Sequence, residues 1–460
     1  LTTLTILFSA IMNVLSDISQ KEYIKKKIVQ FNPMTKITGN CRLLVRPSDE
    51  NLYRNAIIDW SDIISQDLTE PQEKMIANRN AFMTKLKEYS EETIIKFEQF
   101  IEKNVQLVWV HTESFPSAFR LFNVLNARGM PLSNSDLIKN YLLSKAKDDF
   151  ERREVGKLWE DLEDKITVSK LDEFMGHFRT AITGKKQNGT LQEEFTKIID
   201  EHGEKSTEFA KKLLTSADMY LIIKAGSFSN ILSKKSFNSL KRVYYSEWIP
   251  ALLCYLINQI KSISESEYIS LLEKITYQNW IRGLGRTKRN QVYYDIINVI
   301  NRSNDKPSIL DVFTKHSNNT ELLTFLSSDI YGRPYAKSLL LKIEDNSQDD
   351  SVLKDYNGII TIEHILPQTM KDEYWKKLFS EDDKKKLVHK LGNITLLSGR
   401  KNSSAQNYDF HRKKNIYIEK GKKVSFDMTK EVCDHEDWSK IEIEKRQKKY
   451  IDLLFSEFRI

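Results

Sequence analysis

TIEHILPQT, residues 361–369, is the segment from which the fold of the C-terminal third can be inferred. Its β-branched residues predict a strand, and Pro367 ends it because proline has no N–H to give to a sheet. A buried strand has no use for the acid and the imidazole of Glu363 and His364, which stand side by side between two isoleucines. The pair therefore predicts a chemical site at the end of the strand.

A second segment, LGNITLLSGRKNSSAQN (391–407), supplies further polar side chains. Asn393 enters a second predicted strand, Asn402 follows nine positions later after a Gly-Arg-Lys turn, and a helix is expected from Ala405 through Glu419. Strand, loop, strand and helix form a ββα plan, in which the end of the first strand and the start of the helix region converge on one pocket.

Such a pocket suits phosphodiester hydrolysis, which needs a base for water and a cation on the phosphate. His364 is the candidate base because imidazole titrates near neutral pH. Glu363 and Asn402 offer the hard oxygens that Mg²⁺, or Mn²⁺ in its place, prefers. Asn393 is expected to hydrogen-bond across the hairpin and hold the imidazole tautomer. His389, His411 and His435 are expected on the surface.

Two basic clusters are candidate DNA contacts, since phosphate contacts position a duplex without reading its sequence. The first flanks the proposed metal loop and contains Arg400, Lys401, Arg412, Lys413 and Lys414. The second lies in NWIRGLGRTKRNQVYY (279–294), around Gly283 and Gly285, and contains Arg282, Arg286, Lys288 and Arg289. The alternative for the second is an interhelical turn with solvated charges.

The whole sequence has the composition of a soluble, helix-rich chain. Its 460 residues predict two or three domains, with 40% apolar and 29% charged residues and a net charge of only +7. Three cysteines without a C-x-x-C pair favour a reducing cytoplasm, and no apolar run reaches the roughly 20 residues that span a bilayer. The polar stretch 342–358 is expected to be a linker, so that the predicted domains are 1–145, 146–345 and 346–460.

The C-terminal motifs resemble the HNH nuclease superfamily. E-H-I-L-P-Q (363–368) is similar to the D-H-I-x-P-Q segment of HNH domains in CRISPR effector nucleases. More narrowly, I-E-H-I-L-P-Q, L-G-N-I-T-L-L and N-x-x-x-x-N-x-x-F-x-x-K (402–413) resemble the C-terminal HNH domain of GmrSD-type modification-dependent restriction enzymes. The resemblance implies a base at His364, metal ligands at Glu363 and Asn402, a positioning role for Asn393, and supporting roles for Asn407 and Lys413. Two departures are the insert 370–390 and the lack of zinc-binding cysteine pairs.

The N-terminal region resembles the same family. F-x-x-L-N-x-R-G-x-x-L-S-x-x-D-L-x-K-N (122–140) is similar to the distal signature of its ParB-like domain. In that family a nucleotide-associated D-G-Q-Q-R motif runs into L-T-T-L, with which this sequence opens, so the motif is expected to lie upstream of residue 1. Asn126, Arg128 and Lys139 are the candidate nucleotide contacts here. The alternative is a helix–turn–helix in which Ser133 and Asp136 form a capping box.

The sequence therefore predicts a mainly α chain with small α+β parts: a partial ParB-like domain, a helical middle region and a C-terminal ββα-metal nuclease domain. The expected function is metal-dependent cleavage of DNA, as a nick or a double-strand break, in restriction of foreign, modified DNA under control of a nucleotide-dependent module. Two alternatives stay open, a nucleotide-hydrolysing regulator with an inactive HNH domain and a non-catalytic DNA-binding protein. Expected partners are DNA and a nucleotide, and a homo-oligomer is left open.

Overall fold

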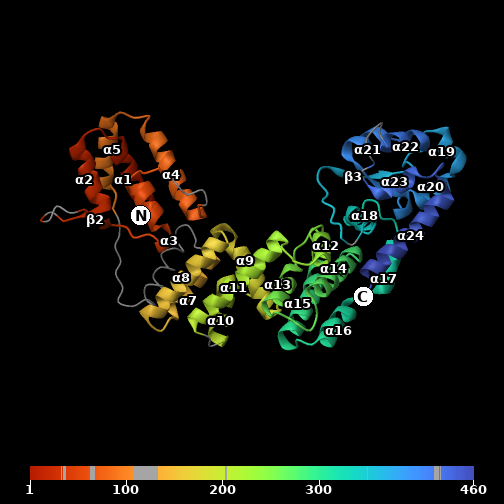
Figure 1. Cartoon of the computed structure of the whole chain (residues 1–460), viewed down its shortest axis with the longest axis horizontal. Helices are drawn as coiled ribbons and strands as arrows, with labels where there is room; N and C mark the ends of the chain where they lie inside the picture. The colour runs from red at the N-terminus through yellow and green to blue at the C-terminus, as the bar shows by residue number, and fades with distance from the viewer. Residues whose placement is uncertain are drawn as a thin grey trace. The chain divides into compact units, whose positions relative to one another are not determined.

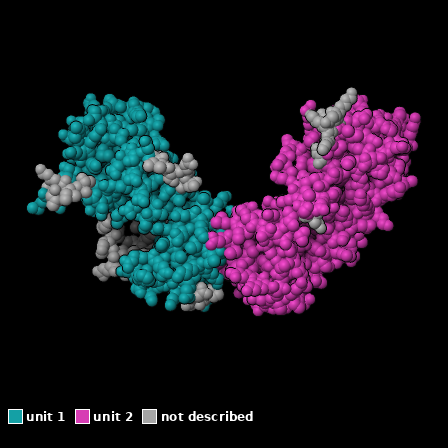
Figure 2. Space-filling model, viewed as in Figure 1, with its two compact units in different colours: residues 1–175, 190–217 teal, residues 176–189, 218–460 magenta. Residues whose placement is uncertain are grey.

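The structure is a computed structural model of the 460-residue chain, and it confirms that the chain is mainly helical (Figure 1). It describes residues 1–32, 34, 38–62, 68–106, 133–202, 205–349, 351–418, 424 and 426–460. Two compact units are coloured in Figure 2: unit 1 contains residues 1–175 and 190–217, and unit 2 contains residues 176–189 and 218–460. The predicted division into three domains stays a prediction.

Unit 1 combines helices with one small antiparallel strand pair, β1–β2. Its elements are α1 (Thr2–Val14), α2 (Ile18–Ile28), β1 (Val29–Phe31), β2 (Thr38–Cys41), α3 (Pro47–Leu52), the π-helix η1 (Tyr53–Ile58), α4 (Glu70–Leu86), α5 (Glu91–Asn104), α7 (Asn134–Ser144), α8 (Asp149–Lys165), the first half of α9 (Val168–Thr183), α10 (Leu191–His202) and the first part of α11 (Ser206–Ala225). The capping box of Ser133 and Asp136 at the start of α7 is confirmed.

The helical part of unit 2 is built around a buried helix, α14 (Glu265–Ile281), which is buried almost continuously from Tyr268 to its end. The helices that accompany it are α12 (Ile231–Leu240), α13 (Ile249–Ile257), α15 (Arg286–Arg302), α16 (Lys306–His316), α17 (Asn319–Leu326) and α18 (Ala336–Asp345). Since α18 reaches Asp345, the predicted linker starts later than residue 342 and leads into the strands from there.

The rest of unit 2 surrounds the antiparallel strands β3 (Ile360–His364) and β4 (Ile394–Ser398), with Glu363 opposite Thr395 and His364 opposite Ile394. The other elements of this part are α19 (Glu373–Leu378), α20 (Glu381–Leu387), the 3₁₀ turn η2 (Leu391–Asn393), α21 (Gly399–Ala405), α22 (Phe410–Ile418), α23 (Asp427–Cys433) and α24 (Lys440–Phe458). Figure 1 labels these helices in the same region as β3. The prediction of a single helix over 405–419 is wrong. Helix α21 starts at Gly399 and ends before Gln406, whose φ is 42°.

The C-terminal helix α24 joins the strand pair to the helical part of unit 2. Near its start it lies so close to Gly392 that a Cβ there would come within 2.1 Å of the Ile443 carbonyl oxygen. At its end the Phe458 ring stacks on Tyr277 of α14, with 4.5 Å between ring centroids. Glycine at position 392 is therefore required by close packing of backbone on backbone.

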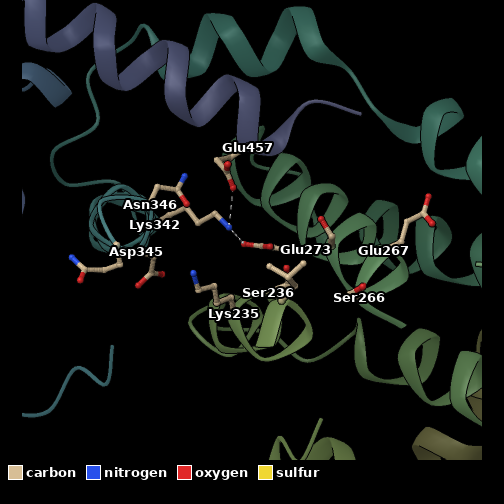
Figure 3. A pocket seen from close by; sticks show the side chains of 12 residues that line it. Lys235, Ser236, Ser266, Glu267, Glu273, Lys342, Asp345, Asn346 and Glu457 are labelled. Atoms are coloured by element: carbon tan, nitrogen blue, oxygen red, sulfur yellow. Dashed lines mark hydrogen bonds and ion pairs between the residues drawn. The ribbon is translucent and has the colours of Figure 1, made fainter. Parts of the chain in front are cut away.

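A buried ion cluster ties α14, α18 and α24 together beside a polar cavity of about 630 Å³ (Figure 3). Lys342 Nζ lies 2.7 Å from Glu273 Oε1 and 3.2 Å from Glu457 Oε2. Burial alone would lower the pKa of Lys342, but the two carboxylates outweigh it and raise that pKa above its usual value. The ammonium thus stays charged in the interior because both partners are in place.

Replacing Lys342 with methionine should lower the free energy of unfolding by about 3–5 kcal/mol, because it leaves the buried Glu273 carboxylate without its counter-charge. The double variant Lys342→Met/Glu273→Leu should recover most of the loss, measured by chemical denaturation. Lys337→Met, at an exposed position of the same helix, is the control and should change stability by no more than about 0.5 kcal/mol. Equal effects of the two single changes would contradict the assignment.

Candidate active site

The carboxylate of Glu363 is buried between β3 and α22. Its side chain is 5% exposed, and its Oε1 accepts hydrogen bonds from Lys413 Nζ at 2.8 Å and from the Tyr417 hydroxyl at 3.0 Å. Lys413 Nζ also donates to the carbonyl oxygen of His364 at 2.6 Å. One lysine therefore holds both the acid and the backbone of the neighbouring histidine.

Burial governs the charges of this pair. It raises the pKa of Glu363 above its usual value, while Lys413 and Tyr417 act in the opposite direction. It likewise lowers the pKa of Lys413, with Glu363 opposing the change. Both shifts follow from removing charged groups from water, which disfavours their ionised forms.

The imidazole of His364 has a different set of neighbours. Its Nε2 lies 3.2 Å from His389 Nδ1, its Nδ1 lies 3.4 Å from Gln368 Nε2, and its ring meets Tyr331 edge to face with centroids 4.1 Å apart. Successive side chains of a strand point to opposite faces, which explains why Glu363 and His364 contact different elements. Burial, followed by His389 and Lys413, lowers the pKa of His364 to about 3, so the imidazole is neutral at physiological pH.

His389 and Tyr331 are the neighbours that sequence reasoning missed. The expectation of a surface position for His389 is wrong, since this ring is half-buried, touches His364 and stacks on Tyr331 with centroids 5.4 Å apart. The His389 carbonyl oxygen also accepts hydrogen bonds from the backbone N–H groups of Ile330 and Tyr331. No motif contained either residue, because one lies in the insert between the strands and the other precedes α18.

The amide of Asn393 is fully buried and fixes the loop that follows His364. Its Oδ1 accepts from Leu366 N at 2.8 Å and from Trp438 Nε1 at 3.2 Å, and its Nδ2 donates to the carbonyl oxygens of Leu366 and Val388, both at 2.9 Å. The predicted hydrogen bond across the hairpin is therefore present, but it holds the backbone. The tautomer of His364 instead depends on His389 and Gln368.

The amide of Asn402, in α21, is anchored against β3 by its nitrogen. Asn402 Nδ2 donates to Thr361 Oγ1 and to the Ile362 carbonyl oxygen, both at 2.9 Å. Among the described residues no donor lies within hydrogen-bonding distance of Oδ1, so this oxygen is available to a ligand. Thr361 and Glu363 share one face of β3, which places Asn402 and Glu363 on the same side of the strand.

The first basic cluster divides into exposed and engaged side chains. Arg400 and Arg412 are exposed, whereas Lys401 Nζ bonds the Tyr417 carbonyl oxygen at 2.6 Å and Lys414 Nζ bonds the His435 carbonyl oxygen at 2.7 Å. Lys413 is 1% exposed and belongs to the interior of the site, so it is not on a surface that DNA reaches. Asn407 is half-buried in the turn between α21 and α22.

The second basic cluster lies at the start of α15. Arg286 and Lys288 are exposed. Arg282 is held by Glu321 at 2.6 Å, and the buried Arg289 by Glu247 at 2.8 Å. Half of this cluster is therefore occupied by intramolecular ion pairs.

The predicted nucleotide contacts lie in the N-terminal region. Asn126 and Arg128 fall outside the described residues. Lys139 Nζ is 3.0 Å from Glu163 Oε1. A nucleotide-binding role for these residues stays a prediction.

Comparison with known protein families finds two domains of one class of restriction enzymes, one near each end of the chain. The model described as the C-terminal domain of GmrSD restriction endonucleases matches residues 314–453, and that for the N-terminal domain matches residues 1–143. Together these matches cover well over half of the chain. The chain belongs to the GmrSD family of restriction endonucleases, which implies a nuclease and DNA as its partner.

Two further observations come from the comparison and from the helices. No curated protein matches the chain. Every helix in the described parts of the chain is too short or too polar to serve as a membrane span.

Replacing Asn393 with alanine should destabilise unit 2 by about 2–4 kcal/mol, because it leaves buried backbone groups of Leu366 and Val388 without partners. Asn402→Ala removes two hydrogen bonds at a half-buried position and should cost about 1 kcal/mol. Chemical denaturation gives the two free energies, and hydrogen exchange should show loss of protection at the Leu366 amide in the first variant only. An unchanged Leu366 amide in Asn393→Ala would refute the anchoring role.

The low pKa of His364 makes a stability prediction. The unfolded chain takes up a proton near pH 6.5 and the folded site near pH 3, so stability is present above pH 6.5 and is lost as the pH falls toward 3. At pH 4.5 the parent protein should be less stable by about 2 kcal/mol because of this histidine, and His364→Gln should not show that loss. His411→Gln, at an exposed histidine, is the control. An identical pH dependence of stability in His364→Gln and the parent would contradict the buried neutral imidazole.

Proposed function

We propose that the chain is a metal-dependent DNA endonuclease of the HNH type, acting in restriction of foreign, modified DNA. The observation that carries the proposal is the adjacency of a buried carboxylate and a neutral imidazole at the end of β3, with the Asn402 oxygen, which no described residue occupies, on the carboxylate side. The plasmid cleavage assay described below also distinguishes a nick in one strand from a cut through both.

The donor set fits a magnesium or manganese ion. These cations take oxygen ligands, and Mg²⁺ commonly keeps several waters and uses only one or two protein groups. Glu363 and Asn402 supply one carboxylate and one amide oxygen from the same face of β3. Within the described residues, no three His, Cys, Asp or Glu side chains gather as a metal site, so a zinc-type site is not the basis of the proposal. A bound cation would supply charge stabilisation for the phosphate.

His364 is proposed to accept the proton of the attacking water. A base must be neutral to do so, and burial keeps this imidazole neutral at physiological pH. A base must also bind a proton well near the working pH, so the proposal requires that the phosphate of bound DNA raise the pKa of His364 from about 3. The contact between His364 Nε2 and His389 Nδ1 orients the ring, and the Asn393 hydrogen bonds fix the backbone that carries it. The protein's part is thus to hold one proton acceptor at a set position.

The exposed guanidinium groups of Arg400 and Arg412 are proposed to hold the DNA backbone beside this site. Both side chains flank Asn402 in sequence, on α21 and α22. Arginine binds phosphate through paired N–H groups, which fixes position as well as charge. The N-terminal part of the chain is proposed to regulate cleavage in response to a nucleotide, in line with the family match to residues 1–143.

One observation favours a second function, that of a regulatory protein with an inactive nuclease domain. Lys413 Nζ occupies Glu363 Oε1, an oxygen that a cation would otherwise use. If this contact persists with DNA bound, the site would bind DNA without cutting it.

Plasmid cleavage with Mg²⁺ or Mn²⁺ tests the proposal. His364→Ala should reduce the rate by about 10²–10⁴-fold, as expected for loss of a general base, and Asn402→Ala should raise the metal concentration needed for half-maximal rate. His411→Ala is the control, because this histidine is exposed and outside the site. Equal cleavage by all four proteins would refute the site. No cleavage by the parent protein with either metal, together with retained DNA binding in EDTA, would establish the inactive alternative.

A further inference from the structure

A second cavity of about 520 Å³ lies in unit 2, where α14 ends and α15 begins. Its wall combines guanidinium groups, aromatic rings and a glycine turn. The residues that line it include Tyr244, Trp280, Arg286, Phe325, Arg333 and Tyr335. Arginines and aromatic rings around a cavity of this size are what a phosphate joined to a planar base requires.

The guanidinium groups differ in how strongly they are already paired. Glu321 and Glu247 occupy Arg282 and Arg289. Arg286 is 81% exposed and lies 4.0 Å from Glu247, at the limit of an ion pair. Among the described residues, the Arg333 side chain has one hydrogen-bond partner, the Asp329 carbonyl oxygen, which accepts from Nε at 3.4 Å. Arg286 and Arg333 thus have positive charge available for an anion.

Two aromatic rings give the cavity a stacking surface and an unused donor. Tyr244 is 69% exposed, a high value for an aromatic side chain, and its ring centroid lies 5.8 Å from that of Trp280. Trp280 is only 6% exposed, yet its indole N–H has no acceptor among the residues that the structure describes. A buried donor without a partner costs free energy, so an incoming acceptor at this position is favoured.

A short segment connects this cavity to the candidate active site. Tyr331 lies against the His364 ring, and Arg333, Pro334 and Tyr335 line the cavity. Two residues of chain span at most about 7 Å, so the backbone that carries Tyr331 and the backbone that lines the cavity lie close together. The two sites are therefore close enough to hold one strand.

We propose that this cavity binds a nucleotide of the DNA strand held at the active site, with its base against Tyr244 and its phosphates on Arg286 and Arg333. For the identity of the ligand the proposal rests on the DNA endonuclease function proposed above. The base must leave the duplex stack to reach the cavity, as in enzymes that extrude a nucleotide into a pocket. Free nucleotides share this chemistry, and the experiment separates the two sources.

The test is binding of two labelled 12-nucleotide strands in EDTA, one of thymidylate and one without bases. The parent protein should bind the thymidylate strand about 5–10-fold more tightly, and Tyr244→Ala should reduce this preference below about 2-fold, because one stacked base contributes roughly 1–3 kcal/mol. Arg286→Gln and Arg333→Gln should weaken both strands and each reduce the slope of log K against log salt by about 0.7. Thymidine monophosphate should compete only at concentrations far above those of the strand.

The control is Lys261→Gln, which removes an exposed charge of unit 2 at a position outside the cavity wall. Three results would overturn the proposal: an unchanged base preference in Tyr244→Ala, a Lys261→Gln effect on binding equal to that of Arg286→Gln, or competition by the free nucleotide as strong as by the strand. The assay needs no cleavage. A protein that cuts no plasmid but loses base preference in Tyr244→Ala therefore retains the cavity and loses only the nuclease assignment.

Discussion

The hydrogen bonds of the Asn393 amide are the constraint on which the C-terminal part of unit 2 depends. One side chain joins the loop after β3, the residue Val388 before η2 and the indole of Trp438. Each bond satisfies a buried polar group that would otherwise lack a partner, so the bonds restrict the conformations open to the loop. The position of the residues just before that loop, Glu363 and His364, follows from it.

The alternation of side chains along β3 then separates two chemical environments. Glu363 enters a compartment closed by Lys413 and Tyr417, where opposite charges balance. His364 enters one made of His389, Gln368 and Tyr331, which offers rings and an amide but no carboxylate. A strand thus places an acid and a base one residue apart without letting them neutralise each other, as they would in direct contact.

Much of this could be predicted from the sequence, because the strands and the polar residues at their ends are local patterns. The rest depends on contacts between distant segments. His389 lies in the insert and Tyr331 lies 33 positions before His364, so no local spacing joins them to the site. The break at Gln406 was missed because no glycine or proline marks it. Burial decides the roles of Lys413 and Arg289, and a basic residue within a motif does not reveal whether its charge faces water or a carboxylate.

The path of α24 has a consequence for how the enzyme is made. The helix closes on Gly392 near its start and on Tyr277 at its end, and it follows every other element of unit 2 in the chain. During translation the strands leave the ribosome first, and the contacts with Gly392 and Tyr277 form only after α24 has been synthesised. A polypeptide that stops before residue 440 therefore lacks the backbone packing that holds η2 beside the strands.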